Sequence, residues 1–221
     1  MKVTLFGATG GVGGQVLTQA LAAGHEVTAV IRTSRTLPGR VRVLRVDLAA
    51  PDPAELQSAV RGADAVLSAV GAGFRSDQGI ATVATRAIVQ AMDAVGARRL
   101  VAISAAPVGT VAVPGRPKPP KHDPGDGIFM RYLMSPLIKA VVPKLYEDLA
   151  VMESTLADSD LEWTVIRPPQ LTDKPLTGVY RTANGRNLRR GLRVSRSDLA
   201  HLMLSVADRP ETYQQVIGVA H

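Results

Sequence analysis

The chain has 221 residues, of which 46% are hydrophobic and 20% charged, a balance typical of globular proteins and unlike that of disordered chains. It contains no cysteine, which excludes disulfides, thiolate metal sites and cysteine nucleophiles. Its formal net charge of +7 permits an acidic partner, such as nucleic acid, an anionic membrane or a phosphate-rich small molecule, without choosing among them.

Strand-like and helix-like segments alternate along the first part of the chain. The hydrophobic periodicity and the positions of glycine and proline predict strands at 3–6, 26–31, 41–46, 65–70 and 100–104, and helices at 12–23, 53–61 and 80–95. This alternation predicts a Rossmann-type α/β fold, in which a doubly wound parallel sheet carries helices on both faces.

The rhythm breaks at residues 107–127, which contain six prolines and four glycines. This density predicts a long surface loop without helix or central strand, either a functional lid or a plain connection. Beyond it we expect helices at 130–142, 145–157 and 197–207 and strands at 163–167, 178–182 and 215–219. Without repeats or a linker, residues 1–221 are expected to form one domain, with residues 168–196 contributing a small C-terminal substrate lobe.

The strongest local motif is the glycine-rich run that begins at Gly7. Gly7, Gly10 and Gly13 are spaced as G-x-x-G-x-x-G between a predicted strand and a predicted helix, which is a variant of the dinucleotide fingerprint. Such glycines allow a tight turn and close approach of the backbone to a pyrophosphate at the helix N-terminus. The alternative is an ordinary glycine-rich turn. The cofactor contacts expected from this run are Gly7, Thr9, Gly10, Gly11, Val12 and Gly13.

The residue after the second predicted strand indicates which dinucleotide would bind. An NAD-preferring site usually carries Asp or Glu here, whereas this chain has Arg32, followed by Ser34 and Arg35. A guanidinium suits a 2′-phosphate and a carboxylate would repel it. We therefore expect NADP(H), and this expectation rests mainly on Arg32. The alternative for Arg35 is a side chain that is only solvated.

Two further strand ends converge on the same crevice, because ligands of parallel sheets bind beyond the carboxyl ends of the strands. Asp47 and Leu48 are placed to meet the adenine, although an Asp that begins the turn into the next helix is equally consistent. Small residues after the fourth strand would let a nicotinamide ribose approach the backbone, and they also suit plain sheet packing. The candidates in that stretch are Ala69, Val70 and Gly71.

Several stretches together resemble the atypical short-chain dehydrogenase/reductase family, and in particular its flavin reductase and biliverdin reductase branch. They are Gly7-Ala8-Thr9-Gly10, Arg32, Asp47-Leu48, Ser104, the run from Trp163 to Pro169, the run from Asp173 to Tyr180, and Ser197-Asp198-Leu199-Ala200. The resemblance implies bound NADP(H) and hydride transfer to a planar conjugated acceptor. It also implies that Ser104 touches the nicotinamide or the substrate and that Pro168 and Gln170 border it. Gln170 stands near a position where the branch often carries His, which leaves the substrate open.

The chain lacks the Tyr and Lys four residues apart that ordinary members of this superfamily use to pass a proton. The residues four positions after its four tyrosines are Pro136, Ala150, Asn184 and Ile217. Flavin or quinone reduction asks less of the protein, since hydride transfer chiefly requires two rings held about 3–3.5 Å apart. Tyr146 is a candidate for substrate stacking or proton supply, with core packing the favoured alternative.

These observations favour an NADPH-dependent oxidoreductase that acts on a flavin, a quinone or a similar small-molecule acceptor. The alternatives are an NADP(H)-binding redox sensor of the NmrA-like type without turnover, and a tailoring reductase or epimerase. The arginines at 186, 189, 190, 193 and 196 are expected to form a solvated face, with attraction of anionic ligands as the alternative. We expect no metal, no nucleic-acid partner and no membrane association, and a cytoplasmic monomer or homodimer.

Overall fold

The computed structural model of the chain describes residues 1–32, 36–71, 79–126 and 142–221. The candidate residues Ser34 and Arg35 and nearly all of the helix expected at 130–142 therefore lie outside the described residues. Within these ranges, no helix combines the length and the apolar character that a membrane crossing requires.

An eight-stranded sheet forms the centre of the molecule, in the order β3-β2-β1-β4-β5-β6-β10-β8. Its strands pair in parallel, except that β8 runs antiparallel to β10 at the edge. This is the doubly wound arrangement expected from the alternating pattern. The strands are β1 (Lys2–Phe6), β2 (Glu26–Ile31), β3 (Val41–Arg45), β4 (Ala65–Ser68), β5 (Arg99–Ile103), β6 (Glu162–Arg167), β8 (Arg181–Asn184) and β10 (Gln215–Ala220).

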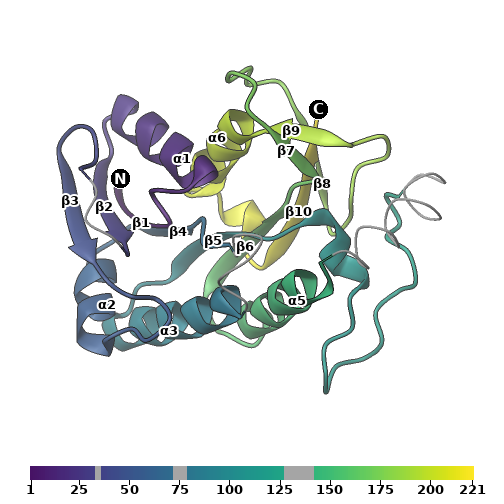
Figure 1. The fold of residues 1–221 in the computed structure, drawn as a ribbon, viewed down its shortest axis with the longest axis horizontal. Helices are drawn as coiled ribbons and strands as arrows, with labels where there is room; N and C mark the ends of the chain where they lie inside the picture. The colour runs from purple at the N-terminus through teal and green to yellow at the C-terminus, as the bar shows by residue number, and fades with distance from the viewer. Residues whose placement is uncertain (33–35, 72–78, 127–141) are drawn as a thin grey trace.

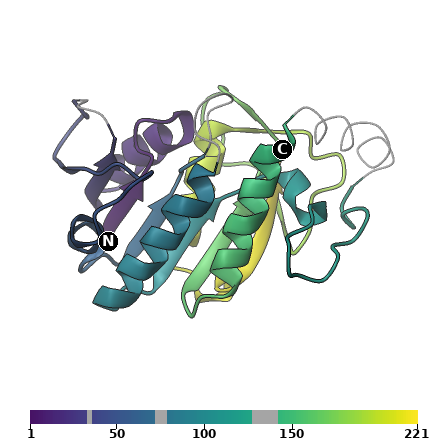
Figure 2. The same cartoon turned by 60° about the horizontal axis from the view of Figure 1, so that its bottom comes forward.

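Helices cover both faces of this sheet (Figures 1 and 2). On one face α1 (Gly11–Ala22) packs beside α6 (Arg196–Val206). On the other face lie α2 (Pro53–Val60), α3 (Ile80–Val95) and α5 (Pro143–Ala157), side by side. Each layer encloses its own apolar cluster, one around Leu5 and Leu199 and one around Phe6 and Met92. Successive residues of β1 thus point to opposite sides, as the pleat of a strand requires.

The C-terminal part differs from the expected pattern in its short strands. The strand predicted at 178–182 begins later, as β8 (Arg181–Asn184), because Thr177 and Gly178 bond through their amides to Asp198. The sequence analysis also missed β7 (Gln170–Thr172) and β9 (Arg193–Ser195), which pair in parallel with each other. Three-residue strands leave too short an alternation to recognise in a sequence.

The proline-rich segment is more ordered than the expected surface loop. It begins with a 3₁₀ helix, η1 (Ala106–Thr110), whose Val108 is buried. The segment is also docked at Asp123, a buried carboxylate that accepts hydrogen bonds from the amides of Gly125 and Asn187. A Cβ added to Gly125 would lie 1.7 Å from the carbonyl oxygen of Asn187. The prediction of a segment without any helix was therefore wrong, because local turn geometry and one buried carboxylate supply the order that proline removes.

Arg99 joins β5 to the end of α6. Its buried guanidinium donates hydrogen bonds to the carbonyl oxygens of Val206 and Ala207 and to the hydroxyl of Thr212, and it lies 4.6 Å from the ring centroid of Tyr213. Burial lowers the pKa of Arg99 to about 10. The side chain thus adds hydrogen bonds to carbonyl groups at the end of α6, where the helix supplies no further amide donors.

We predict that Arg99→Ala lowers the free energy of unfolding by about 3 kcal/mol, because it removes several hydrogen bonds between a buried guanidinium and carbonyl groups at the end of α6. Urea denaturation followed by circular dichroism would measure this loss. The neighbouring Arg98 is exposed, and Arg98→Ala is the matched control, with an expected change within about 0.5 kcal/mol. Equal losses for the two variants would contradict the assignment.

Candidate functional site

A cavity of about 200 Å³ opens at the carboxyl ends of β1, β2, β3 and β4. It lies where the chain leaves each of these strands, which is the crevice in which open parallel sheets bind ligands. The lining residues are Gly7, Thr9, Gly10, Val30, Ile31, Arg32, Asp47, Leu48, Ala69, Val70, Gly71 and Ile80. Nine of these were singled out in the sequence, so the fold brings most of the candidate cofactor residues into one space.

The glycine loop at this cavity is built by contacts that admit no side chain. Gly7 has a φ of +80°, and a Cβ on it would lie 2.7 Å from the carbonyl oxygen of Ala69. A Cβ on Gly13 would lie 2.0 Å from the carbonyl oxygen of Gly7. The first turn of α1 is therefore pressed against the end of β1, and only glycine permits this approach.

The N-terminus of α1 has no side-chain cap. Its N-cap residue is Gly10, and its first turn contains no acidic residue. The amide of Gly14 donates to the carbonyl oxygen of Gly10, whereas the earlier amides of a helix have no intrahelical acceptor. Gly11 is exposed at this end and Val12 packs into the core. Free amides and the positive end of the helix dipole suit an anionic group such as a phosphate.

Arg32 and Asp47 form the far wall of the cavity. Arg32 follows β2 directly and is exposed. Asp47 lies two residues beyond the end of β3, where its carboxylate accepts a hydrogen bond of 3.0 Å from the amide of Ala49. Asp47 thus makes the turn that the sequence analysis offered as an alternative, while still lining the cavity together with Leu48. The helix that follows is capped by Asp52 instead.

Ser104 and Pro168 lie where the next two strands of the sheet, β5 and β6, end. Ser104 is 6% exposed, and its hydroxyl has no hydrogen-bond partner among the residues that the structure describes. Pro168 is buried, and its carbonyl oxygen accepts a bond from the amide of Ala106. A buried hydroxyl without a partner is costly, so Ser104 is the candidate residue here most in need of a ligand.

Gln170 and Tyr146, like Ser104 and Pro168, are not among the residues that line the cavity. Gln170 is exposed on β7, where its side-chain oxygen accepts a bond of 3.2 Å from Nε of Arg193. Tyr146 packs against the apolar cluster on the α2–α3–α5 side of the sheet. Burial raises the pKa of Tyr146, which keeps the phenol protonated. This position agrees with the core-packing alternative for Tyr146.

A larger cavity, of about 390 Å³, lies at the opposite edge of the sheet. Lys2, Glu26, Arg42 and Arg61 are among its lining residues, and the first two begin β1 and β2. It therefore stands at the amino ends of the strands, away from the start of α1. The carboxyl edge remains the candidate site, because parallel sheets present their loops and helix N-termini there.

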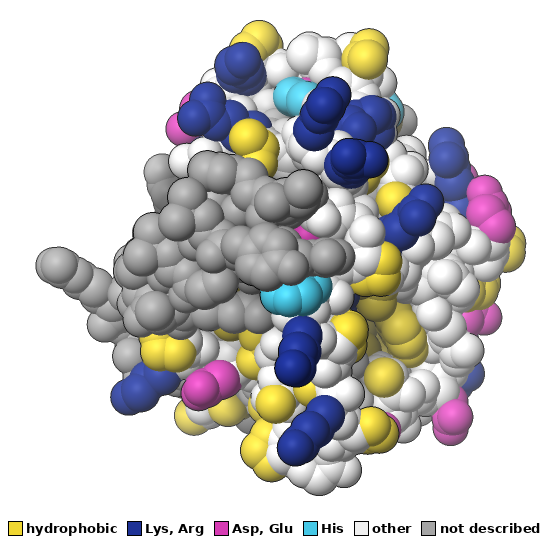
Figure 3. Space-filling view, turned by 90° about the vertical axis from the view of Figure 1, so that its right-hand side faces the viewer, with side chains coloured by type: hydrophobic (Ala, Val, Ile, Leu, Met, Phe, Trp, Pro, Cys, Tyr) yellow, Lys and Arg dark blue, Asp and Glu magenta, His cyan; other side chains and the backbone are white. Residues whose placement is uncertain are grey.

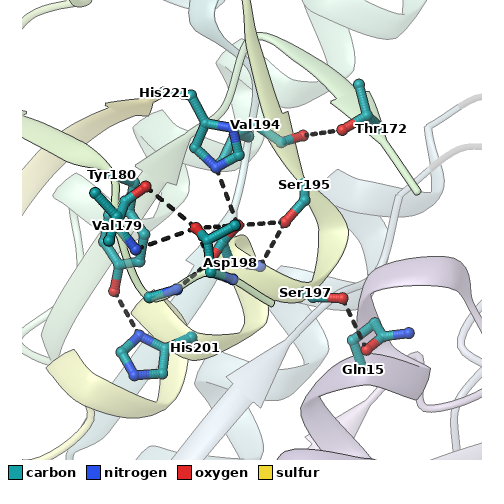
Figure 4. A network of polar contacts seen from close by, with 12 residues as sticks. Gln15, Thr172, Val179, Tyr180, Val194, Ser195, Ser197, Asp198, His201 and His221 are labelled. Carbon is teal, nitrogen blue, oxygen red and sulfur yellow. Dashed lines mark hydrogen bonds and ion pairs between the residues drawn. The ribbon is translucent and has the colours of Figure 1, made fainter. Parts of the chain in front are cut away.

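Residues 168–196, called the C-terminal lobe below, are joined to the rest of the molecule by hydrogen bonds to Asp198, at the start of α6 (Figure 4). This fully buried carboxylate accepts hydrogen bonds from the hydroxyl of Ser195, from the amides of Thr177 and Gly178, and from Nε2 of His221. Burial by itself raises the pKa of Asp198, and these hydrogen bonds outweigh it, so that the pKa falls to about 2. Asp198 therefore remains ionised and holds the turn before β8.

The basic run divides into two kinds of residue. Arg186, Arg189, Arg190 and Arg193 are exposed, as expected for a solvated face. Figure 3 shows the face that carries the proline-rich end of the molecule, where basic side chains gather in the upper part and acidic ones lie mainly at the margins. Arg196 differs, because its side chain is only 30% exposed and lies against Gly11. The sequence analysis did not distinguish it, since only the packing of α6 on α1 brings it to the glycine loop.

With this geometry in place, comparison with known proteins decides the family. A model of the NAD(P)H-binding family matches residues 7–210, which is most of the chain. The chain belongs to the NAD(P)H-binding family. The NAD(P)H-binding character that the resemblance implied in the sequence is thereby confirmed.

Several solved structures are similar in fold to this protein and align with the full length of its chain. The oxidoreductase ylbE from Lactococcus lactis is 18% identical with a TM-score of 0.80, and 100% of this chain and 91% of that chain are covered. A short-chain dehydrogenase/reductase from Veillonella parvula in complex with NADP is 19% identical (TM-score 0.78, coverage 100% and 94%). The anaerobillin reductase ChuY from Escherichia coli O157:H7 is 24% identical (TM-score 0.75, coverage 100% and 97%). These likenesses confirm the Rossmann-like α/β fold.

The depressed pKa of Asp198 predicts a specific loss of stability in acid. Because the folded pKa of about 2 lies below the ordinary aspartate pKa of 3.8, the ionised form contributes stability above pH 3.8, and this contribution is lost as the pH falls toward 2. At neutral pH, Asp198→Asn should therefore lose about 2 kcal/mol of unfolding free energy. Denaturant titrations at several pH values would measure this.

The control for that series is Asp93→Asn, which alters an exposed carboxyl on α3 and should change the unfolding free energy by no more than about 0.5 kcal/mol. The Asp198 variant should also show a flatter dependence on pH than the parent protein between about pH 4 and pH 2. A parallel acid profile in the parent and in Asp198→Asn would rule out this role of the carboxylate.

Proposed function

We propose that this protein is an NADPH-dependent reductase that transfers hydride to a planar conjugated acceptor such as a flavin or a quinone. Membership of the NAD(P)H-binding family supplies the cofactor class. The single observation that carries the finer proposal is Arg32, which lines the same cavity as Gly7 and Gly10. The guanidinium of Arg32, in the same cavity as the glycine loop, fits a dinucleotide that carries a 2′-phosphate.

Each part of such a cofactor has a matching group in the cavity. The amides and dipole at the start of α1, beyond Gly10, would hold the pyrophosphate. Arg32 would hold the 2′-phosphate, and Asp47 and Leu48 would lie against the adenine. Val70 and the small residues beside it would accommodate the nicotinamide ribose. These assignments all use residues that line the cavity or begin α1.

The chemistry proposed asks for positioning more than for acid catalysis. When bound, the reduced nicotinamide supplies the hydride. The chain has no Tyr and Lys four residues apart on one helix, so it lacks the usual proton donor of alcohol and carbonyl reduction in this superfamily. Ser104, with its unpartnered hydroxyl at the end of β5, would orient the nicotinamide or the acceptor through one hydrogen bond. The structural likeness to an anaerobillin reductase and to an oxidoreductase supports a reductase.

A second candidate function is an NADP(H)-binding redox sensor that performs no turnover. The observation in its favour is the same missing Tyr–Lys pair, since a sensor requires the cofactor site alone. The basic exposed face of the C-terminal lobe would then contact a partner.

Arg32→Asp tests the cofactor preference. This variant should weaken NADPH binding by roughly a hundredfold and NADH binding by only a fewfold, because it removes a charged hydrogen bond to the 2′-phosphate and adds a repelling carboxylate. Fluorescence titration of the two reduced cofactors would measure both constants. Arg61→Asp makes the same change of charge at the opposite edge of the sheet and should leave both constants within about twofold. Equal losses for NADPH and NADH in Arg32→Asp would overturn the preference.

Turnover separates the reductase from the sensor. Oxidation of NADPH, followed by its absorbance, should be seen with at least one flavin or quinone of a broad panel. With that acceptor, Ser104→Ala should lower kcat about tenfold while leaving the Kd for NADPH nearly unchanged, the loss expected for one hydrogen bond made during reaction. Tight NADPH binding without oxidation across the panel would favour the sensor.

A further inference from the structure

Arg196, the first residue of α6, lies directly on Gly11, the first residue of α1. A Cβ added to Gly11 would lie 2.8 Å from Nε and 2.9 Å from Cδ of Arg196. The guanidinium therefore occupies the space that any larger residue at position 11 would need. The cofactor contacts proposed above do not include this arginine.

Two hydrogen bonds hold the start of α6 against α1, and a third caps α6. The hydroxyl of Ser197 donates to Oε1 of Gln15 over 3.1 Å, and Nε2 of Gln19 donates to the carbonyl oxygen of Ser197 over 2.9 Å. Ser195 caps α6 by accepting a bond from the amide of Asp198. The residues on both sides of Arg196 are thus fixed, and its backbone has little freedom to move away from the glycine loop.

The electrostatic setting of Arg196 is unfavourable for a cation. It stands at the N-terminus of α6 and against the N-terminus of α1, which are the positive ends of two helix dipoles. Asp198 is committed to the amides of Thr177 and Gly178. Within the described structure, the carboxylate paired with Arg196 is that of Asp173, which is 87% exposed and 2.6 Å from Nη1. An ion pair so exposed contributes little.

We propose that Arg196 is a ligand to the pyrophosphate of the dinucleotide, supplied by the C-terminal lobe to the glycine loop. This inference rests on the proposed function. An anion at the start of α1 would meet helix amides on one side and a guanidinium on the other. Its negative charge would offset the unfavourable position of Arg196 at the positive ends of two helices. Guanidinium suits this task because its planar fork can donate two parallel hydrogen bonds to phosphate oxygens. Cofactor binding would then also fix the lobe that carries β7, β8 and β9.

The test uses two ligands that differ in the pyrophosphate. NADP⁺ contains it, whereas adenosine 2′-monophosphate carries the 2′-phosphate alone. Arg196→Gln should weaken NADP⁺ binding at least tenfold, in line with the loss of a hydrogen bond between charged groups, and should leave the Kd for adenosine 2′-monophosphate within twofold. Arg32→Asp should weaken both. Calorimetry for NADP⁺ and ligand-observed NMR for the fragment would give these constants, and thermal denaturation would establish that each variant is folded.

Matched controls are available at Arg193, in β9, and at Gly14, in the same helix as Gly11. Arg193→Gln alters an exposed arginine three residues away and should bind NADP⁺ as the parent protein does. Gly11→Ala should mimic Arg196→Gln by displacing the guanidinium, and the double variant should lose no more than either single one. Gly14→Ala meets its nearest atom at 3.8 Å and should have no effect. Arg196→Lys, with the charge but not the fork, should recover part of the affinity.

The results separate this inference from the function on which it rests. If the parent protein binds neither NADP⁺ nor the fragment, the proposed function fails. If the parent binds both and Arg196→Gln binds NADP⁺ equally well, Arg196 is not a ligand and only the inference is overturned. A loss for Arg196→Gln that is equal for NADP⁺ and for the fragment would also overturn it, because the effect would then not depend on the pyrophosphate.

Discussion

The close approach of Gly13 to Gly7 is the constraint on which the site depends. A Cβ at position 13 would come within 2.0 Å of the Gly7 carbonyl oxygen, so the absence of a side chain is what lets α1 begin immediately beside the end of β1. This contact directs the helix N-terminus into the cavity and leaves room beside Ala69. The anion binding proposed for the cavity would therefore be a consequence of backbone packing.

The C-terminal lobe is attached to this framework by buried polar groups. Asp198 gathers the turn at Thr177, the cap of α6 at Ser195, and His221 around one carboxylate. Asp123 does the same for the proline-rich segment and Asn187. Buried, fully bonded carboxylates of this kind specify one arrangement, because any other would leave a charge without partners. They give short strands and irregular segments an order that apolar packing alone does not supply.

The site combines a binding surface with little catalytic equipment. It offers a phosphate cradle, a cation at Arg32 and one unpartnered hydroxyl at Ser104, and the sequence holds no Tyr–Lys pair. In the proposed function, such a site would accelerate a reaction by holding reactants in position rather than by moving protons. Arg196 fits the same logic, because it would add binding energy from a lobe that lies far along the chain from the glycine loop.

Local sequence determined the alternation of strands and helices, the glycine loop, and the change from an acidic residue to Arg32, because each depends on residues that are neighbours in the chain. It therefore predicted the sheet and most of the cavity wall. Only the tertiary structure decided that Gln170 lies outside the cavity and that Tyr146 packs into the core. It also decided that Arg196 lies on Gly11, whereas the other arginines of the basic run are exposed. Those outcomes depend on how β7 pairs with β9, how α5 packs on α3 and how α6 packs on α1, and such long-range contacts leave no periodic signal in the residues that make them.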